Sequence, residues 1–329
     1  MSNRVKNQHY VSKFYLRVFA NPKEQLFVFD KQKDTEFINN INTTATGRSF
    51  YDIPEDWMSD KSADVQAVEK AFSALENYYR PAHSKAIGLG FGDKLDLDTA
   101  KVLAHMLRSQ FLRTRAARRN GHELHQQIAE DCIEDICERN IPGDEWRKVK
   151  PLIAVDERLT GILIGQLIFD ASIMDSMVKA LLRKHWTFWL NRTENLFITS
   201  DHPVSLAVTS ERAYEHGVGP ASPFGVEVAF PLSPTCLLTV GDRPPLSSPN
   251  GHSFYVERER IDLFNHMQVV GSDRYLFGQT NAFQWARKAC ADYPALREPA
   301  TNQSQVVSMR DKRISTTAAI FMPRHVAIY

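Results

Sequence analysis

Hydrophobic and polar positions divide the chain into three stretches, and the first of them covers residues 1–60. Apolar residues recur there at helical spacing, at Val11, Phe14, Tyr15, Val18 and Phe19. This spacing predicts a short helix over residues 12–19. After the Asn21-Pro22 turn, the alternating run LFVFDK precedes a second extended piece around Phe37-Ile38. The two extended pieces together predict a β-hairpin.

The second stretch, residues 62–185, has the periodicity of helices. Between residues 64 and 88 the apolar stripe consists of Val65, Val68, Phe72, Leu75 and Tyr79. Such a stripe predicts a helix that buries one face. Asp96 and Asp98 then stand where an N-cap is expected, and a long helix should follow to about Arg139, where Ile141-Pro142-Gly143 stops it. A further helix is predicted over residues 155–184.

The third stretch, residues 186–297, is rich in short β-type runs separated by Pro, Gly and Asn turns: WTFWLN, LFITS, VSLAV, VEVAFPLS and CLLTVGD. Two helices are predicted near 257–269 and 281–291, with the extended RYLFG between them. Strands at both ends flank a helical middle, which predicts an α+β fold. We expect a helical middle layer packed on a mostly antiparallel sheet, built from the C-terminal strands and the N-terminal hairpin. Residues 1–297 should form a single domain, with a C-terminal extension over 298–329.

Composition narrows the class of protein without naming a function. The 329 residues are 43% hydrophobic and 24% charged, and the formal net charge is +1. Such a balance provides no overall field that would recruit nucleic acid or an anionic membrane surface. No apolar window of membrane-spanning length and no secretory leader is found, and the four cysteines lack CxxC spacing. We therefore expect a cytoplasmic, soluble protein with reduced thiols; its oligomeric state is not readable from the sequence.

Two longer motifs carry a resemblance to a known family. They are NQHYVSKFYLRVF near the start and FITSDHPVSL after the middle. Shorter matches accompany them at Phe50-Tyr51, Gln110 with Arg113-Thr114, Pro231-Leu232-Ser233-Pro234 and Arg274-Tyr275. Together they resemble the DUF4238 family, whose members usually have Pro, Pro and Asn where this chain has Ser12, Arg115 and His202. The family has no settled reaction, so the resemblance implies no catalytic residue.

His9 heads the first candidate constellation. It precedes the predicted helix, on which Lys13 and Arg17 are four residues apart and share a face. Cations beside a helix N-terminus suit an anion, and a histidine there can act as a general acid or base near neutral pH. The structural alternative is that His9 and Arg17 only tie the N-terminus down through local hydrogen bonds.

Asp201 is the second candidate, because it follows a predicted strand and precedes His202-Pro203. A carboxylate at a strand end can orient a base or hold a divalent metal, and that metal is the one cofactor we consider. The structural alternative is an Asx-turn, in which the carboxylate accepts a backbone hydrogen bond two residues on.

The predicted long helix also carries a dense group of arginines, at Arg108, Arg113, Arg115, Arg118 and Arg119. Arg108, Arg115 and Arg119 fall on one side of that helix, which favours contact with phosphates or RNA. The acidic run that follows favours the alternative of a salt-bridged solvent face. Gln110 and Arg113 lie on a different side, and we expect them to face the N-terminal helix.

Two functions remain open at this level. The first is a hydrolase or nuclease acting on a phosphate-bearing or nucleic-acid substrate. It would use His9 and Asp201 as catalytic residues and Lys13, Arg17, Gln110 and Arg113 to bind the anion. The second is a non-catalytic module that binds nucleic acid or protein, as in bacterial stress or phage defence. Whether His9, Arg113 and Asp201 converge in space separates the two.

Overall fold

The computed structural model of the chain describes residues 4–58, 64–140, 154–210, 212–213, 218–242 and 249–299. Residues 300–329, nearly all of the expected C-terminal extension, lie outside the described residues. So does the predicted helix stop at 141–143. The fold class is α+β, as the alternation of strand-rich and helix-rich stretches predicted.

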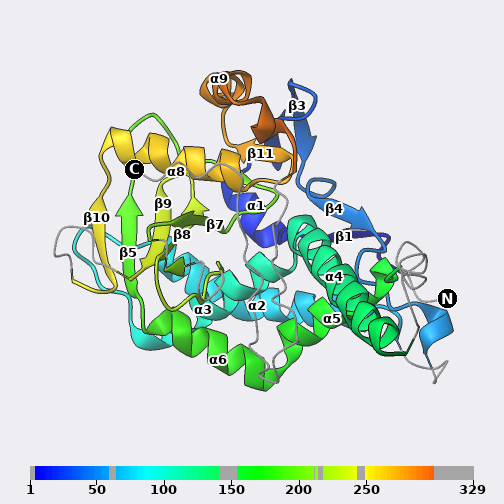
Figure 1. The fold of residues 1–329 in the computed structure, drawn as a ribbon. Helices are drawn as coiled ribbons and strands as arrows, with labels where there is room; N and C mark the ends of the chain where they lie inside the picture. Colours follow the sequence, from blue (N-terminus) through cyan, green and yellow to red (C-terminus); the bar gives the residue numbers. More distant parts are fainter. Residues whose placement is uncertain are drawn as a thin grey trace.

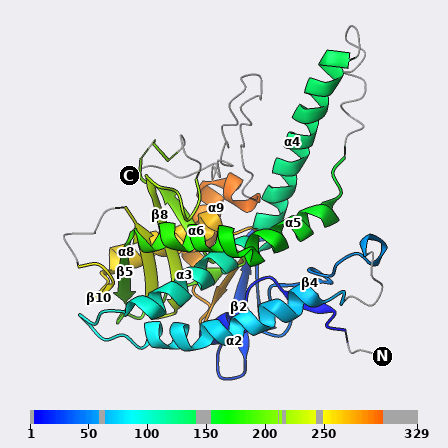
Figure 2. The ribbon, with the colours of Figure 1, turned by 90° about the horizontal axis from the view of Figure 1, so that it is seen from below.

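The helical middle consists of α2 (Ala67–Ile87), α3 (Leu97–Leu112), α4 (Arg115–Asn140), α5 (Glu157–Phe169) and α6 (Ala171–Leu182). The prediction of one long helix from Asp96 to Arg139 was wrong, because the chain turns at Arg113-Thr114 and the Thr114 hydroxyl accepts the Ala117 amide. The helix expected over 155–184 also breaks, since Asp170 leaves the helical conformation and caps α6. Helix α4 projects from the body (Figure 2).

Among the described helices no single one is long and apolar enough to cross a membrane. Taken together, α5 and α6 have the length and composition of a span, but they are bent against each other by 64°.

The described strands form three sheets. A five-stranded sheet has the order β10 (His252–Tyr255), β5 (His185–Leu190), β9 (Cys236–Gly241), β8 (Val226–Ser233), β7 (Ser205–Val208). A four-stranded sheet has the order β3 (Thr35–Asn40), β2 (Gln25–Asp30), β11 (Tyr275–Gly278), β6 (Thr199–Ser200). The short strands β1 (Asn7–His9) and β4 (Thr46–Arg48) pair with each other.

The sheets confirm one expectation and correct another. The N-terminal hairpin forms as β2 and β3, and every described strand pair except β10 with β5 is antiparallel. The hairpin, however, does not join the five-stranded sheet that contains most of the C-terminal strands. It pairs with β11 and through it with β6, so the expected single sheet is two. Its partner strand is thus one that lies about 250 residues further along the chain, which local periodicity does not reveal.

The five-stranded sheet is covered on both faces, as alternation along β5 requires. Trp186 and Phe188 pack into the large core with α2 and α3. Trp189 lies on the other face, in a second cluster with Phe264 of α8 (Arg258–Gly271). Figure 1 shows α8 and the helical middle on opposite sides of these strands, with α9 (Gln284–Asp292) beside the smaller sheet.

Helix α1 (Lys13–Phe19) joins the N-terminal segment to the body of the protein. Its Tyr15 ring is fully buried and stacks on Phe230 of β8. The Tyr15 hydroxyl shares a hydrogen bond with the Thr199 hydroxyl (2.6 Å) and donates to the Pro231 carbonyl (2.7 Å). One side chain near the start of the chain therefore bridges both larger sheets.

His83 of α2 makes the stability of this core dependent on pH. Its Nε2 donates to the Leu232 carbonyl (2.8 Å), and burial lowers its pKa to about 4. The unfolded chain binds this proton near pH 6.5, so the free energy of unfolding falls as pH drops from about 6.5 to 4. Between pH 7 and pH 4 we expect the free energy of unfolding of His83→Gln to fall by roughly 3 kcal/mol less than that of wild type. Urea unfolding at both pH values measures this; equal losses would contradict it.

Candidate functional site

Arg113, at the junction of α3 and α4, is held entirely by internal partners. Its Nη1 donates to the Ser12 hydroxyl (2.7 Å) and the Glu76 carboxylate (2.8 Å), and its Nη2 donates to the His9 carbonyl (2.5 Å). The guanidinium also lies 4.3 Å from the ring centroid of Phe72, and only 3% of the side chain is exposed. Arg113 therefore ties the N-terminal segment to α2 and to the end of α3.

Gln110 and His9 belong to the same group of contacts. The Gln110 carboxamide accepts the Ser12 amide and donates to the Tyr10 carbonyl, each at 3.2 Å. The half-buried His9, on strand β1, donates from Nε2 to the Ile41 carbonyl (2.8 Å). Burial lowers the pKa of His9, and the positive charges of Arg113 and Lys13 lower it further. At neutral pH the His9 ring is therefore uncharged.

Arg17 does not join this group. It is exposed on α1, and its Nε donates to the Glu24 carboxylate (2.9 Å). Lys13 and Arg17 are four residues apart on α1, as predicted, but they differ in their surroundings. Lys13 is half-buried near His9, and Arg17 forms a surface ion pair.

The Asp201 carboxylate is buried and accepts three backbone amides, from Asp273 (2.8 Å), Arg274 (2.8 Å) and Tyr275 (2.9 Å). It thereby holds the turn that leads into β11. Burial and the neighbouring Asp273 carboxylate raise the pKa of Asp201 to about 6, against the effect of the amide donors. Within the described part of the chain, no group of three His, Cys, Asp or Glu side chains is arranged to hold a metal.

The two longer motifs meet at the α3–α4 junction. The Thr114 hydroxyl and His202 Nδ1 share a hydrogen bond (2.7 Å), and both side chains are buried. Burial lowers the pKa of His202 to about 4. His9, Gln110 and Arg113 are therefore brought together, whereas the Asp201 carboxylate is engaged by the backbone amides of 273–275.

The arginines of the predicted long helix, of which Arg108, Arg115 and Arg119 were expected on one face, have separate surroundings. Arg108 is 1% exposed and donates to the Leu167 and Ile168 carbonyls, so it is not a surface residue. Arg118 donates to the Phe50 carbonyl (2.7 Å), and Arg119 pairs with Asp273. The predicted continuous basic face is absent because the body of the protein, rather than solvent, surrounds the start of α4.

A small pocket lies where the first motif meets β11. Its volume is about 170 Å³, and its lining includes Tyr10, Asn39, Arg115 and Tyr275. The Arg115 guanidinium lies 4.9 Å from the centroid of the Tyr10 ring and donates to the Thr46 carbonyl (3.3 Å). Burial, followed by the charge of Asp201, raises the pKa of the Tyr10 phenol, which stays protonated.

Several polar groups of this pocket have no hydrogen-bond partner among the described residues. They are the hydroxyls of Tyr10 and Tyr275 and the Asn39 amide nitrogen; the Asn39 oxygen accepts the Asn40 amide and the Thr43 hydroxyl. Sequence reasoning did not select these residues. The family-like Arg274-Tyr275 pair was the signal that could have indicated Tyr275, whereas Asn39 stands in an ordinary hairpin strand.

The family comparison covers all of these residues. The model of a family described as "Protein of unknown function (DUF4238)" matches residues 7–282. No curated protein and no solved structure matches the chain.

Proposed function

Because this chain belongs to the DUF4238 family, whose function is unknown, we propose a function from the site alone: binding of a small phosphate-bearing ligand in the pocket of Tyr10, Arg115 and Tyr275. The observation that carries the proposal is the set of donors without partners around one cavity. Arg115 has no carboxylate partner among the described residues, and a guanidinium keeps its charge at all physiological pH values. Two phenol hydroxyls and the Asn39 amide add neutral donors.

The size of the pocket limits what enters it. A volume of about 170 Å³ is below the roughly 300 Å³ at which pockets for drug-sized molecules begin. The pocket suits a phosphate group, with the remainder of the ligand outside. The Arg115 side chain lines the pocket and is exposed, so a phosphate can reach it from solvent.

Hydrolysis of the bound phosphate ester, with His9 and Asp201 as catalytic residues, is the second candidate. It is favoured by the pKa of Asp201, which is raised to about 6. The charge of Asp201 also raises the pKa of the Tyr10 phenol, which lines the pocket. Binding without hydrolysis is the better supported of the two, since both Asp201 oxygens already accept backbone amides.

We expect Arg115→Gln to weaken the binding of inorganic phosphate at least tenfold, because charge-assisted hydrogen bonds contribute about 1.5–3 kcal/mol. Tyr10→Phe, which removes one neutral donor, should weaken binding by a smaller factor. Isothermal titration calorimetry measures both. Arg17→Gln is the matched control, since Arg17 is an exposed arginine of α1 that does not line the pocket and has its own carboxylate partner.

The proposal fails if Arg115→Gln binds phosphate as wild type does, or if wild type does not bind it. The same proteins, incubated with nucleotides and RNA and analysed by mass spectrometry, separate binding from hydrolysis. Product that forms with wild type and Arg17→Gln but not with Asp201→Asn supports the second candidate.

A further inference from the structure

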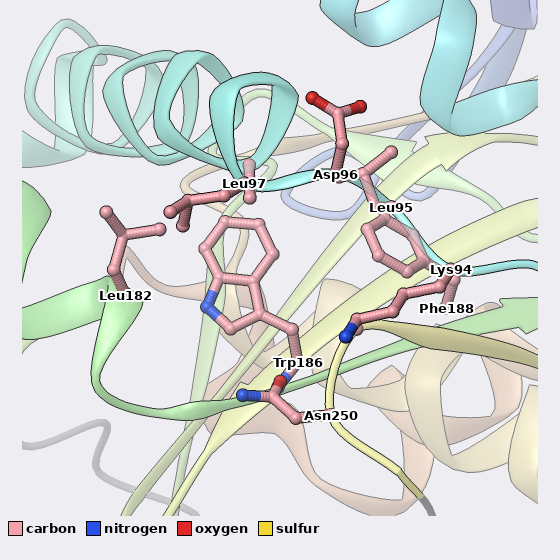
Figure 3. Close-up of a pocket in the computed structure, with 10 residues that line it drawn as sticks. Lys94, Leu95, Asp96, Leu97, Leu182, Trp186, Phe188 and Asn250 are labelled. Atoms are coloured by element: carbon pink, nitrogen blue, oxygen red, sulfur yellow. The ribbon is translucent and has the colours of Figure 1, made fainter.

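A second cavity, larger than the pocket of Tyr10, Arg115 and Tyr275, lies between the start of α3, the end of α6 and strand β5. Its volume is about 550 Å³, inside the range of roughly 300–1,000 Å³ of small-molecule sites. Figure 3 shows the side chains that line it. None of them belongs to the motifs discussed above.

One part of this cavity is apolar. Trp186 and Phe188 of β5 are buried, whereas Leu97 at the start of α3 is 63% exposed. In Figure 3 Leu97 and Leu182 are drawn beside the Trp186 indole. An exposed leucine beside an indole gains free energy when a ligand covers it, at about 25 cal/mol per Å² of apolar surface.

The walls are fixed by hydrogen bonds, so the cavity exists before a ligand binds. The Trp186 indole nitrogen donates to the Leu181 carbonyl (2.9 Å), and its backbone amide donates to the Asn250 carboxamide oxygen (2.9 Å). The Leu95 amide donates to the Gly251 carbonyl (3.0 Å), which joins the two loops that border the cavity. A preformed cavity avoids part of the ordering cost of binding.

The polar part of the lining is cationic. Lys94 has no ion pair or side-chain hydrogen bond among the described residues, and the same holds for the Asn250 amide nitrogen. Asp96 is already engaged, by the Lys85 ammonium (2.5 Å) and by the amide and hydroxyl of Thr99. Figure 3 shows the Lys94 ammonium and the Asn250 carboxamide at the same end of the cavity.

We propose that this cavity binds an aromatic monocarboxylate. Its ring would lie against the Trp186 indole and Leu97, and its carboxylate would accept from Lys94 and Asn250. One unneutralised cation suits a single negative charge, and the nearby Asp96 carboxylate disfavours a doubly charged group such as a phosphate. The flat indole and the apolar wall favour an aromatic ring.

Titration calorimetry with 2-naphthylacetate and its neutral analogue 2-naphthylethanol tests the proposal. We expect Lys94→Gln to weaken the binding of the acid about fivefold, because it removes a partly exposed ion pair. The binding of the alcohol should be unchanged. Leu97→Glu should weaken the binding of both probes by about tenfold or more, because it removes apolar contact, and it should weaken the acid further because it adds a like charge. Lys94 and Leu97 are both exposed, so both variants should fold as wild type does.

The controls are exposed residues that do not line the cavity. Lys101→Gln removes an exposed lysine of α3 that pairs with Asp98, and Leu263→Glu changes an exposed leucine of α8. Both should bind as wild type does, and so should Arg115→Gln, since the two pockets share no residue. If wild type binds neither probe, or if Lys94→Gln weakens acid and alcohol equally, the proposal is overturned.

Discussion

The Arg113→Ala variant is expected to be about 3–5 kcal/mol less stable than wild type, because it removes one member of a buried ion pair. The guanidinium donates to Ser12, Glu76 and the His9 carbonyl and lies over the Phe72 ring. Alanine leaves these polar groups without a donor and opens a space beside the ring. The loss should release residues 7–12 from α2 and α3.

Urea unfolding followed by far-UV circular dichroism measures the change. Arg113→Lys keeps the charge but cannot donate to three acceptors in a planar fork, so we expect an intermediate loss. Arg17→Ala is the matched control: its ion pair with Glu24 is about half exposed and should contribute less than about 1 kcal/mol. If Arg113→Ala lowers the free energy of unfolding no more than Arg17→Ala does, the contacts of Arg113 do not stabilise the fold.

The Asp201→Ala variant is expected to lose about 3 kcal/mol at pH 7, since three buried amides lose their acceptor at roughly 1 kcal/mol each. The loss should increase as the pH is lowered. The pKa of Asp201 is about 6 in the folded protein, above the ordinary value of 3.8. The Asp201 carboxyl therefore takes up a proton more readily in the folded protein than in the unfolded chain, so the contribution of this one group to stability increases as pH falls from about 6 to 4.

Unfolding of wild type and Asp201→Ala at pH 7 and pH 4 tests both statements. Asp201→Asn, which keeps an oxygen acceptor, should lose less than Asp201→Ala. His202 titrates in the same acid range, but it is present in all three proteins and affects their differences little. If the difference in free energy of unfolding between wild type and Asp201→Ala becomes smaller toward pH 4, the raised pKa of Asp201 is contradicted.

The fold class was predictable because it depends on local periodicity. The apolar stripe of 64–88 and the alternation of LFVFDK each specify an element regardless of what surrounds it. The helix breaks at Arg113-Thr114 and Asp170 were not predictable. Thr114 and Asp170 are residue types that favour caps, but such residues also occur inside helices with their side chains turned to solvent, so the partner that each side chain finds decides. The division into two sheets depends on β11, which pairs with a hairpin near the other end of the chain.

The sequence indicated which segments contribute to the candidate site, but not which of their residues contact one another. His9, Gln110 and Arg113 do gather, because each contacts the N-terminal strand or the turn behind it. Their partners lie about 100 residues away, and no pattern in the sequence states whether such a contact serves binding or stability. The catalytic roles of His9 and Asp201 stay predictions. Arg108 was misjudged for the same reason, since its acceptors are carbonyls of α5.

The anchoring of α1 by Tyr15 also governs how the protein is made. The two acceptors of the Tyr15 hydroxyl are 184 and 216 residues further along the chain. At ordinary translation rates of about 5–20 residues per second, the ribosome needs roughly 10 to 40 seconds to synthesise that length. Phe14, Tyr15 and Phe19 therefore emerge well before the surface that buries them exists. A chain that stops before β8 would retain His83 of α2 beside Phe14, but the Tyr15 ring would lack Phe230 and its hydroxyl would lack the Pro231 acceptor, and we expect such exposed aromatic surface to favour chaperone binding.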